Sequence, residues 1–240
     1  QWLTLYFSKV NLLFLLYVVN PMNFDIEGLK ALTWVYAQRE GTITPNTWEK
    51  IIAKSTGGKH IPGDVYMADG YSNSEGQNDK SVLKEFTKRD EQTISFVQCR
   101  CPLDESGDIG KGVIKTLVDK RQESFKDFKL NKMMDVIIVH NRDGENYNVR
   151  VFCYEQPKYE DINYEWHGGK AYLNPDKSKK KWEETWKIKR IPGDDSAFQT
   201  CVFIKKTFNK SNAIADFTVK CDNNYDVDME KAKKEYAEAQ

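Results

Sequence analysis

The stretch TISFVQCRC, residues 93–101, alternates apolar and polar side chains in the manner of a β-strand. In a strand, side chains two residues apart point to the same face of the sheet. Ile94, Phe96, Gln98 and Arg100 therefore share one face, which begins apolar and ends in an amide and a guanidinium. This change along one face predicts that the strand starts in a core and ends at a polar site.

A second interpretation of the polar end stays open. Gln98 and Arg100 are then solvated at the end of the strand, with Arg100 paired to Asp104 or Glu105.

Hydrophobic periodicity on both sides of this strand predicts the fold class. Apolar residues recur at helical spacing in residues 25–41, 46–54 and 110–130. Asp25 is the N-cap candidate of the first helix. Strands are predicted at residues 81–88, 93–101, 135–140, 147–155, 186–190, 197–205 and 214–221. Residues 81–88 also fit a helix, and we favour a hairpin with residues 93–101. The order of elements predicts a mixed α+β domain, with a central mixed sheet flanked by helices.

Composition and charge limit the function classes. The 240 residues carry 36 Lys and Arg against 36 Asp and Glu, so the formal net charge is zero. A uniformly basic nucleic-acid-binding coat is excluded, but local basic clusters occur at residues 111–121 and 177–190. The five cysteines are irregularly spaced and odd in number, which is a poor disulfide framework and offers no paired zinc motif. Buried free thiols fit better, and we expect a cytoplasmic protein.

Residues 1–21 are strongly apolar but are interrupted by polar side chains. A transmembrane helix needs about 20 consecutive apolar residues. We favour a core or interface segment, or an extension upstream of a start at Met22, over a membrane anchor, and we expect no membrane association. The predicted organisation is this segment, a single domain at residues 22–225 and a charged tail at residues 226–240. Within the domain, the core lies at about residues 79–154 and the C-terminal strands at residues 181–221.

The polar end of the strand at residues 93–101 has the composition of a divalent-metal site. In the predicted hairpin, Asp79 precedes the first strand and lies opposite residues just past Arg100. Gln98 offers a carbonyl oxygen to a cation, and Arg100 offers a positive charge to a phosphate. Asp64 is a rival acid, and Asp79 has the alternative of being an N-cap or turn residue.

The succession of an acid, VQCR, an amphipathic helix and DVIIVH resembles the PD-(D/E)xK nucleases over residues 79–154. It is most similar to the Mrr-like variant, where glutamine replaces the usual glutamate. The resemblance implies a restriction-endonuclease-like core, Mg²⁺ as cofactor, and site-specific cleavage of double-stranded DNA by a homodimer. The catalytic residues that it implies are Asp79, Gln98 and Arg100, with the metal held by Asp79, Gln98 or Asp64. Additional acids that it suggests are Glu27, Glu40 and Glu85.

Two departures from the family pattern keep other functions open. Arg100 stands where the family has lysine, and Asp79 follows Asn78 rather than proline. Arginine clamps phosphate but does not accept a proton. One alternative is therefore a non-cleaving nucleic-acid-binding module with the same fold. Another, which rests on the apolar residues 2–19, is a membrane-tethered interaction domain.

Three segments are predicted to contact DNA. Residues 55–80 form a long polar loop that suits base edges, unless it is only a mobile loop. The helix after the motif packs beside the phosphate backbone in such folds. Residues 177–190 interleave lysine with tryptophan, which suits stacking and clamping but also suits an exposed edge strand protected by lysines. The predicted contacts are Gln77, Asn78, Lys80, Lys111, Lys115, Lys120, Arg121, Lys181 and Trp182.

Overall fold

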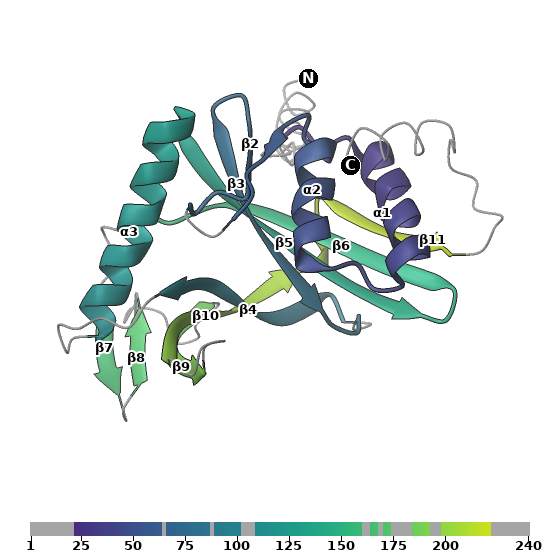
Figure 1. The fold of residues 1–240 in the computed structure, drawn as a ribbon. Coiled ribbons are helices and arrows are strands. Elements are labelled where there is room, and N and C mark those ends of the chain that lie inside the picture. The colour runs from purple at the N-terminus through teal and green to yellow at the C-terminus, as the bar shows by residue number, and fades with distance from the viewer. Residues whose placement is uncertain are drawn as a thin grey trace, which may run out of the picture.

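Figure 1 shows the fold in a computed structural model, which describes residues 22–63, 66–86, 89–101, 109–159, 164–167, 170–173, 184–192 and 198–221. These residues form two β-sheets and three α-helices, with both parallel and antiparallel strand pairs. The predicted class, a mixed α+β domain, is confirmed. The N-terminal segment at residues 1–21 and the tail at residues 226–240 lie outside the described residues.

The larger sheet has six strands in the order β1-β2-β3-β5-β6-β11. β3 runs parallel to β5, and the connection between them passes through β4 and α3. The other pairs in this sheet are antiparallel. Its strands are β1 (Lys59–His60), β2 (Gly70–Ser72), β3 (Glu75–Leu83), β5 (Lys132–Asp143), β6 (Asn146–Glu155) and β11 (Ala215–Lys220).

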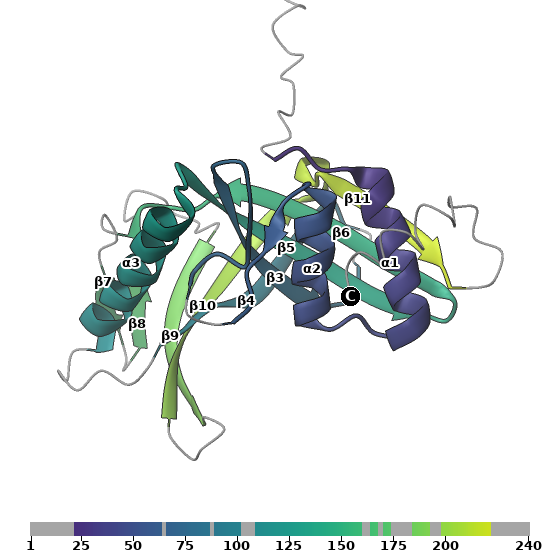
Figure 2. The ribbon, with the colours of Figure 1, turned by 45° about the horizontal axis from the view of Figure 1, so that its top comes forward.

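The smaller sheet has five antiparallel strands in the order β4-β10-β9-β8-β7. Figures 1 and 2 show α3 (Ile109–Phe128) at the side of the molecule where this sheet lies. A 3-10 turn, Lys210–Asn212, joins β10 of the smaller sheet to β11 of the larger one. The strands are β4 (Glu91–Cys101), β7 (Tyr164–His167), β8 (Lys170–Leu173), β9 (Glu184–Pro192) and β10 (Phe198–Asn209).

Two capped helices cover one face of the larger sheet (Figure 2). α1 (Ile26–Glu40) begins at Asp25, whose side chain accepts from the backbone N–H of Gly28, and it ends at Gly41 with φ +73. α2 (Pro45–Ser55) begins at Thr44, with proline in the first turn, where its missing N–H costs no hydrogen bond. Both helices lie where the sequence predicted them.

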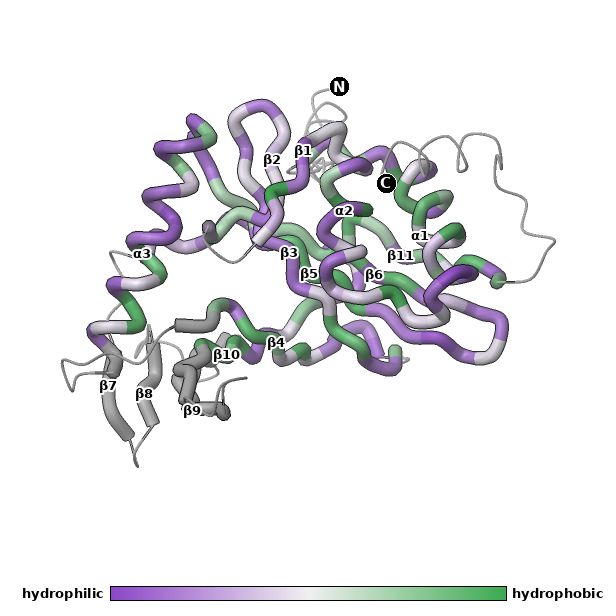
Figure 3. The backbone as a smooth tube through the Cα atoms, in the orientation of Figure 1, coloured by the Kyte–Doolittle hydropathy of each residue, from purple (hydrophilic) through white to green (hydrophobic). Residues whose placement is uncertain are grey.

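β5 is the centre of the core because it is buried on both faces. Met133, Ile137 and Val139 join the apolar cluster between the two sheets, whereas the alternate residues join the cluster beneath α1 and α2. This explains why DVIIVH is a continuous apolar run rather than an alternating one. Figure 3 shows hydrophobic residues along the central parts of β5 and β6.

Two predictions about residues 55–88 are wrong. The hairpin of residues 81–88 with residues 93–101 is not formed, because β3 pairs with β2 and β5 while β4 pairs with β10 in the other sheet. Residues 55–80 are not a single polar loop, because they contain β1, β2 and most of β3. The cause is that β3 carries buried polar side chains, which find hydrogen-bond partners inside the protein instead of apolar neighbours.

The remaining elements agree with the sequence. α3 matches the helix predicted at residues 110–130, and β4 matches the strand at residues 93–101. The other predicted strands correspond to β5, β6, β9, β10 and β11. In the part of the chain that the structure describes, no helix is long and apolar enough to cross a membrane.

At Gly58, just before β1, the backbone lies very close to the backbone of β2. A Cβ at Gly58 would lie 2.4 Å from the backbone oxygen of Tyr71 in β2. Because backbone cannot rotate away, we expect Gly58→Ala to lower the free energy of unfolding by about 1–3 kcal/mol, the usual range for overpacking. The adjacent Gly57 has φ +64 and open space around an added Cβ, so Gly57→Asn should change stability little. Equal urea midpoints for the two variants would contradict this account of the close approach.

Candidate functional site

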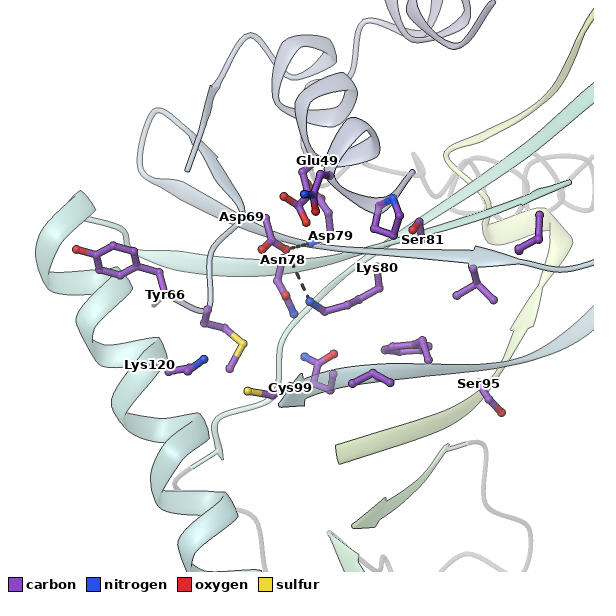
Figure 4. Close-up of a pocket in the computed structure, with 18 residues that line it drawn as sticks. Glu49, Tyr66, Asp69, Asn78, Asp79, Lys80, Ser81, Ser95, Cys99 and Lys120 are labelled. Carbon is purple, nitrogen blue, oxygen red and sulfur yellow. Dashed lines mark hydrogen bonds and ion pairs between the residues drawn. The ribbon is translucent and has the colours of Figure 1, made fainter. Parts of the chain in front are cut away.

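A cavity of about 660 Å³ lies between β3 of the larger sheet and β4 of the smaller one. Figure 4 shows its lining residues, which also come from α2, from the segment before β2 and from Lys120 on α3. The cavity exists because β2 pairs only with Glu75, Gly76 and Gln77 of β3. Beyond these residues, β3 has no strand partner on the side away from β5, so its edge faces the cavity.

Three carboxylates meet at this edge. Asp79 lies in the middle of β3, Asp69 lies just before β2, and Glu49 projects from α2 (Figure 4). The carboxylate of Asp69 accepts a 2.6 Å hydrogen bond from the backbone N–H of Asp79. The side chain of Asp79 is buried, and among the described residues neither of its carboxylate oxygens has a hydrogen-bond partner.

The negative charge at this edge is only partly offset. Burial raises the pKa of Asp79 well above its usual range, and the nearby carboxylates of Asp69 and Glu49 raise it further. Burial also raises the pKa of Glu49, with Asp69 adding to the effect, although His60 lies 3.2 Å away and opposes it. A cation bound among these groups would therefore favour their ionised forms.

Lys80 supplies a positive charge on the other face of β3. Its ammonium lies 3.7 Å from the Asp69 carboxylate and makes no hydrogen bond within the described residues. Burial lowers the pKa of Lys80, but the carboxylates of Asp69 and Asp135 outweigh it, so that the pKa is raised. Lys80 is consequently charged at neutral pH and has donors to offer to an anion.

A buried cluster of amides around Asp135 includes two residues that line the cavity, Asn78 of β3 and Gln98 of β4. Asp135 of β5 accepts hydrogen bonds from Asn78 Nδ2 at 2.7 Å, from Gln98 Nε2 at 3.0 Å and from Gln156 Nε2 at 2.6 Å. Gln98 Nε2 also donates to Tyr159 Oη at 2.8 Å. Burial raises the pKa of Asp135, and the three amide donors oppose that shift.

The structure brings together part of the predicted site. Asp79, Gln98, Asn78 and Lys80 all line the cavity. Successive side chains on a strand leave opposite faces, so Asp79 points toward Glu49 and α2, while Asn78 and Lys80 point toward β4 and Gln98. The prediction that Asp79 precedes the strand is wrong, because Asp79 lies within β3.

The other predicted residues are more scattered. Gln77 and Asn78 are buried and hydrogen-bonded within the protein, so they do not lie in an exposed base-reading loop. Lys111 and Lys115 are exposed on α3, and Arg121 stacks over the ring of Phe125 at 4.5 Å. Arg100 belongs to β4, but its side chain lies outside the described residues, as do Asp64, Asp104, Glu105, Lys181 and Trp182.

Sequence reasoning missed Asp69 and Glu49. The acids that it suggested in the first helix lie elsewhere: Glu27 pairs with Lys30, and Glu40 accepts from the backbone N–H of Thr44. Glu49 has one usable signal, since it sits between the buried residues Trp48 and Ile51 of an amphipathic helix. Asp69 carries no signal of its own, because its role depends on the short strand that follows it.

Comparisons with protein-family models, with curated proteins and with solved structures found no match for this chain.

The carboxylates at the edge of β3 fit a divalent cation only if water and substrate complete its coordination. Among the described residues, no three His, Cys, Asp or Glu side chains are placed to hold a metal ion together. Mg²⁺ does not need such a cage, because it keeps several waters and is usually bound by one or two carboxylates together with substrate phosphates. The unpartnered carboxylate of Asp79 beside Asp69 fits that mode of binding.

The burial of Asp79 has a consequence for stability. Because its pKa is raised in the folded state, the folded protein retains this proton to higher pH than the unfolded chain, whose Asp titrates near pH 4. Stability is therefore lost as pH rises from about 4 through the raised pKa of Asp79. We expect Asp79→Asn to stabilise the protein at pH 8 by about 1–3 kcal/mol, the usual cost of an unsatisfied buried group.

The control for this variant is Asp216→Asn. The carboxylate of Asp216 is paired with Arg150 at 3.1 Å, so neutralising it should not stabilise the protein. The melting temperatures of both variants and of the wild type are measured by thermal unfolding at pH 4 and pH 8. A melting temperature of Asp79→Asn equal to or below that of wild type at pH 8 would refute the assignment.

Proposed function

We propose that the protein is a Mg²⁺-dependent DNA endonuclease that hydrolyses phosphodiester bonds in double-stranded DNA, acting as a homodimer at specific sites. The observation that carries the proposal is the unpartnered, buried carboxylate of Asp79 beside Asp69, with the charged Lys80 next to them. The resemblance of residues 79–154 to the PD-(D/E)xK nucleases and the exposed lysines of α3 support the choice of DNA as substrate.

The roles differ from those that the motif alone suggested. Asp69 and Asp79 would hold the cation, and Glu49 would add negative charge beside them. When bound, a divalent cation lowers the pKa of a coordinated water and offsets charge on the scissile phosphate. Lys80, charged and without a hydrogen bond among the described residues, would bind a phosphate oxygen and stabilise its developing charge.

Lysines of α3 would supply the contacts to DNA outside the cavity. Lys111 and Lys115 are exposed on this helix, and Lys120 lies at the cavity. Such residues bind backbone phosphates without reading sequence, which positions a duplex against the cavity. Their effect on affinity should depend on salt concentration, because each phosphate contact releases counterions.

Cleavage of plasmid DNA tests the proposal directly. We expect discrete products with Mg²⁺ and none without it, and we expect Asp79→Asn and Asp69→Asn to abolish cleavage. Lys80→Met should lower kcat by about 10²-fold or more, as the loss of a transition-state donor does. The control is Asp119→Asn on α3, which removes an exposed carboxylate paired with Lys115 and should leave cleavage intact. Intact DNA with a gel shift would instead indicate a non-cleaving nucleic-acid-binding module.

Binding of Mg²⁺ should strengthen as pH rises. Asp79 must lose its proton to hold a cation, and its pKa is raised, so the affinity should be weak below that pKa and should increase above it. At 100 times the dissociation constant, Mg²⁺ should stabilise the wild type by about 2.7 kcal/mol. Thermal unfolding with and without Mg²⁺, at pH 5 and pH 8, measures this effect. Stabilisation of Asp79→Asn to the same extent would show that the ion binds elsewhere.

A further inference from the structure

All three amides around Asp135 are oriented the same way, with their N–H groups toward its carboxylate. An ionised carboxylate only accepts hydrogen bonds, so the amide oxygens must turn away from it. Accordingly, Asn78 Oδ1, Gln98 Oε1 and Gln156 Oε1 are buried and have no hydrogen-bond partner in the part of the chain that the structure describes. Three unpaired acceptors around one group are unusual, because a buried unpaired acceptor destabilises the protein.

The orientation of the Gln98 amide is set by Asp135, because an ionised carboxylate only accepts hydrogen bonds. Its amide nitrogen donates one hydrogen to Asp135 and the other to Tyr159 Oη. Rotating the amide by half a turn would set Oε1 against the carboxylate and break the hydrogen bond to Asp135, whereas the Tyr159 hydroxyl can pair with either amide atom. The direction of Oε1 therefore follows from the position of Asp135, which makes Asp135 a positioning residue for this oxygen.

Two of these three amides line the cavity. Asn78 and Gln98 are among its lining residues, whereas Gln156 lies behind them. Lys80 lines the same part of the cavity, with an ammonium that makes no hydrogen bond among the described residues. This part of the cavity is thus lined by two amides whose buried oxygens lack a partner among the described residues, beside a lysine that is paired only with Asp69 at 3.7 Å.

We propose that this part of the cavity is a subsite for one nucleotide of the substrate. An anionic phosphate oxygen binds Lys80, and N–H or O–H donors of the same nucleotide bind Gln98 Oε1 and Asn78 Oδ1. The cavity volume of about 660 Å³ lies in the range of small-ligand pockets and suits one nucleotide rather than a duplex. The choice of a nucleotide rests on the proposed function, but the need for donors beside an anion comes from the side chains themselves.

The subsite should discriminate by hydrogen-bond donors. A site with buried polar groups rejects ligands that leave those groups unpaired. Dimethyl phosphate is a monoanion without donors, whereas 2′-deoxycytidine 5′-monophosphate (dCMP) adds the amino group of its base and the 3′-hydroxyl of its sugar. The two are compared near pH 5, below the second phosphate pKa of about 6, so that both carry a single negative charge. Calorimetric titration should therefore show dCMP binding at least tenfold more tightly than dimethyl phosphate. Cytidine 5′-monophosphate separates the two sources of donors, because a further gain would indicate a contact to the sugar 2′-hydroxyl.

Variants separate the roles of the residues. Gln98→Met and Asp135→Asn should each reduce the affinity for dCMP about tenfold and leave that for dimethyl phosphate unchanged, whereas Lys80→Met should weaken both. Gln156→Met also removes a donor to Asp135 but lies outside the cavity lining, so it should reduce the preference for dCMP far less. In ¹H–¹⁵N spectra, dCMP should shift the side-chain amide signals of Asn78 and Gln98 and leave Gln156 in place.

Three outcomes overturn the subsite: no preference for dCMP in the wild type, a preference retained in Gln98→Met, or no binding of either ligand. Stabilisation by Mg²⁺ is measured on the same samples and depends on Asp79, so it reports on the proposed function separately. Mg²⁺ stabilisation without dCMP preference would refute the subsite alone. A dCMP preference without Mg²⁺ stabilisation would refute the metal-dependent nuclease and retain the subsite.

Discussion

The hydrogen bonds to the buried carboxylate of Asp135 are the interaction on which the rest of the site depends. They connect β5 to β3 through Asn78, to β4 through Gln98 and to the segment after β6 through Gln156. β3 and β4 belong to different sheets, so this one side chain fixes the distance between the sheets where the cavity lies. Removing one partner of such a buried network leaves the others unpaired, which makes the arrangement cooperative.

A second polar connection closes the other end of the space between the sheets. Arg150 of β6 donates to Gln92 of β4 at 3.1 Å and to Asp216 of β11 at 3.1 Å, and its guanidinium stacks over Phe86. Between the two connections the sheets are joined by apolar residues, with Phe152 stacked against Phe208. Polar contacts therefore join the two sheets at Asp135 and at Arg150, and the cavity lies between β3 and β4.

The helices and the apolar strands could be predicted from the sequence, because their signals are local. Asp25 and Gly41 mark the ends of α1, and the apolar run of β5 marks a strand buried on both faces. β3 could not be predicted, since its buried polar side chains are satisfied by residues up to 57 positions away, such as Asp135. The same holds for the site: Asp79 and Gln98 were found by pattern, whereas Asp69 and Glu49 join them only through the pairing of β2 and β3 and the packing of α2.

The polar composition of β3 is itself an argument for function. A strand at this position gains stability from apolar residues, yet β3 places Gln77, Asn78 and Asp79 in succession at buried positions. Within the described ranges of the chain, the carboxylate of Asp79 finds no hydrogen-bond partner there, and neither does the amide oxygen of Asn78. Burying such groups unpaired lowers stability, and an apolar or neutral replacement would remove that cost. The unpaired atoms belong to residues that line one cavity. The simplest physical account is that a bound cation and a polar ligand supply the missing partners of these atoms there.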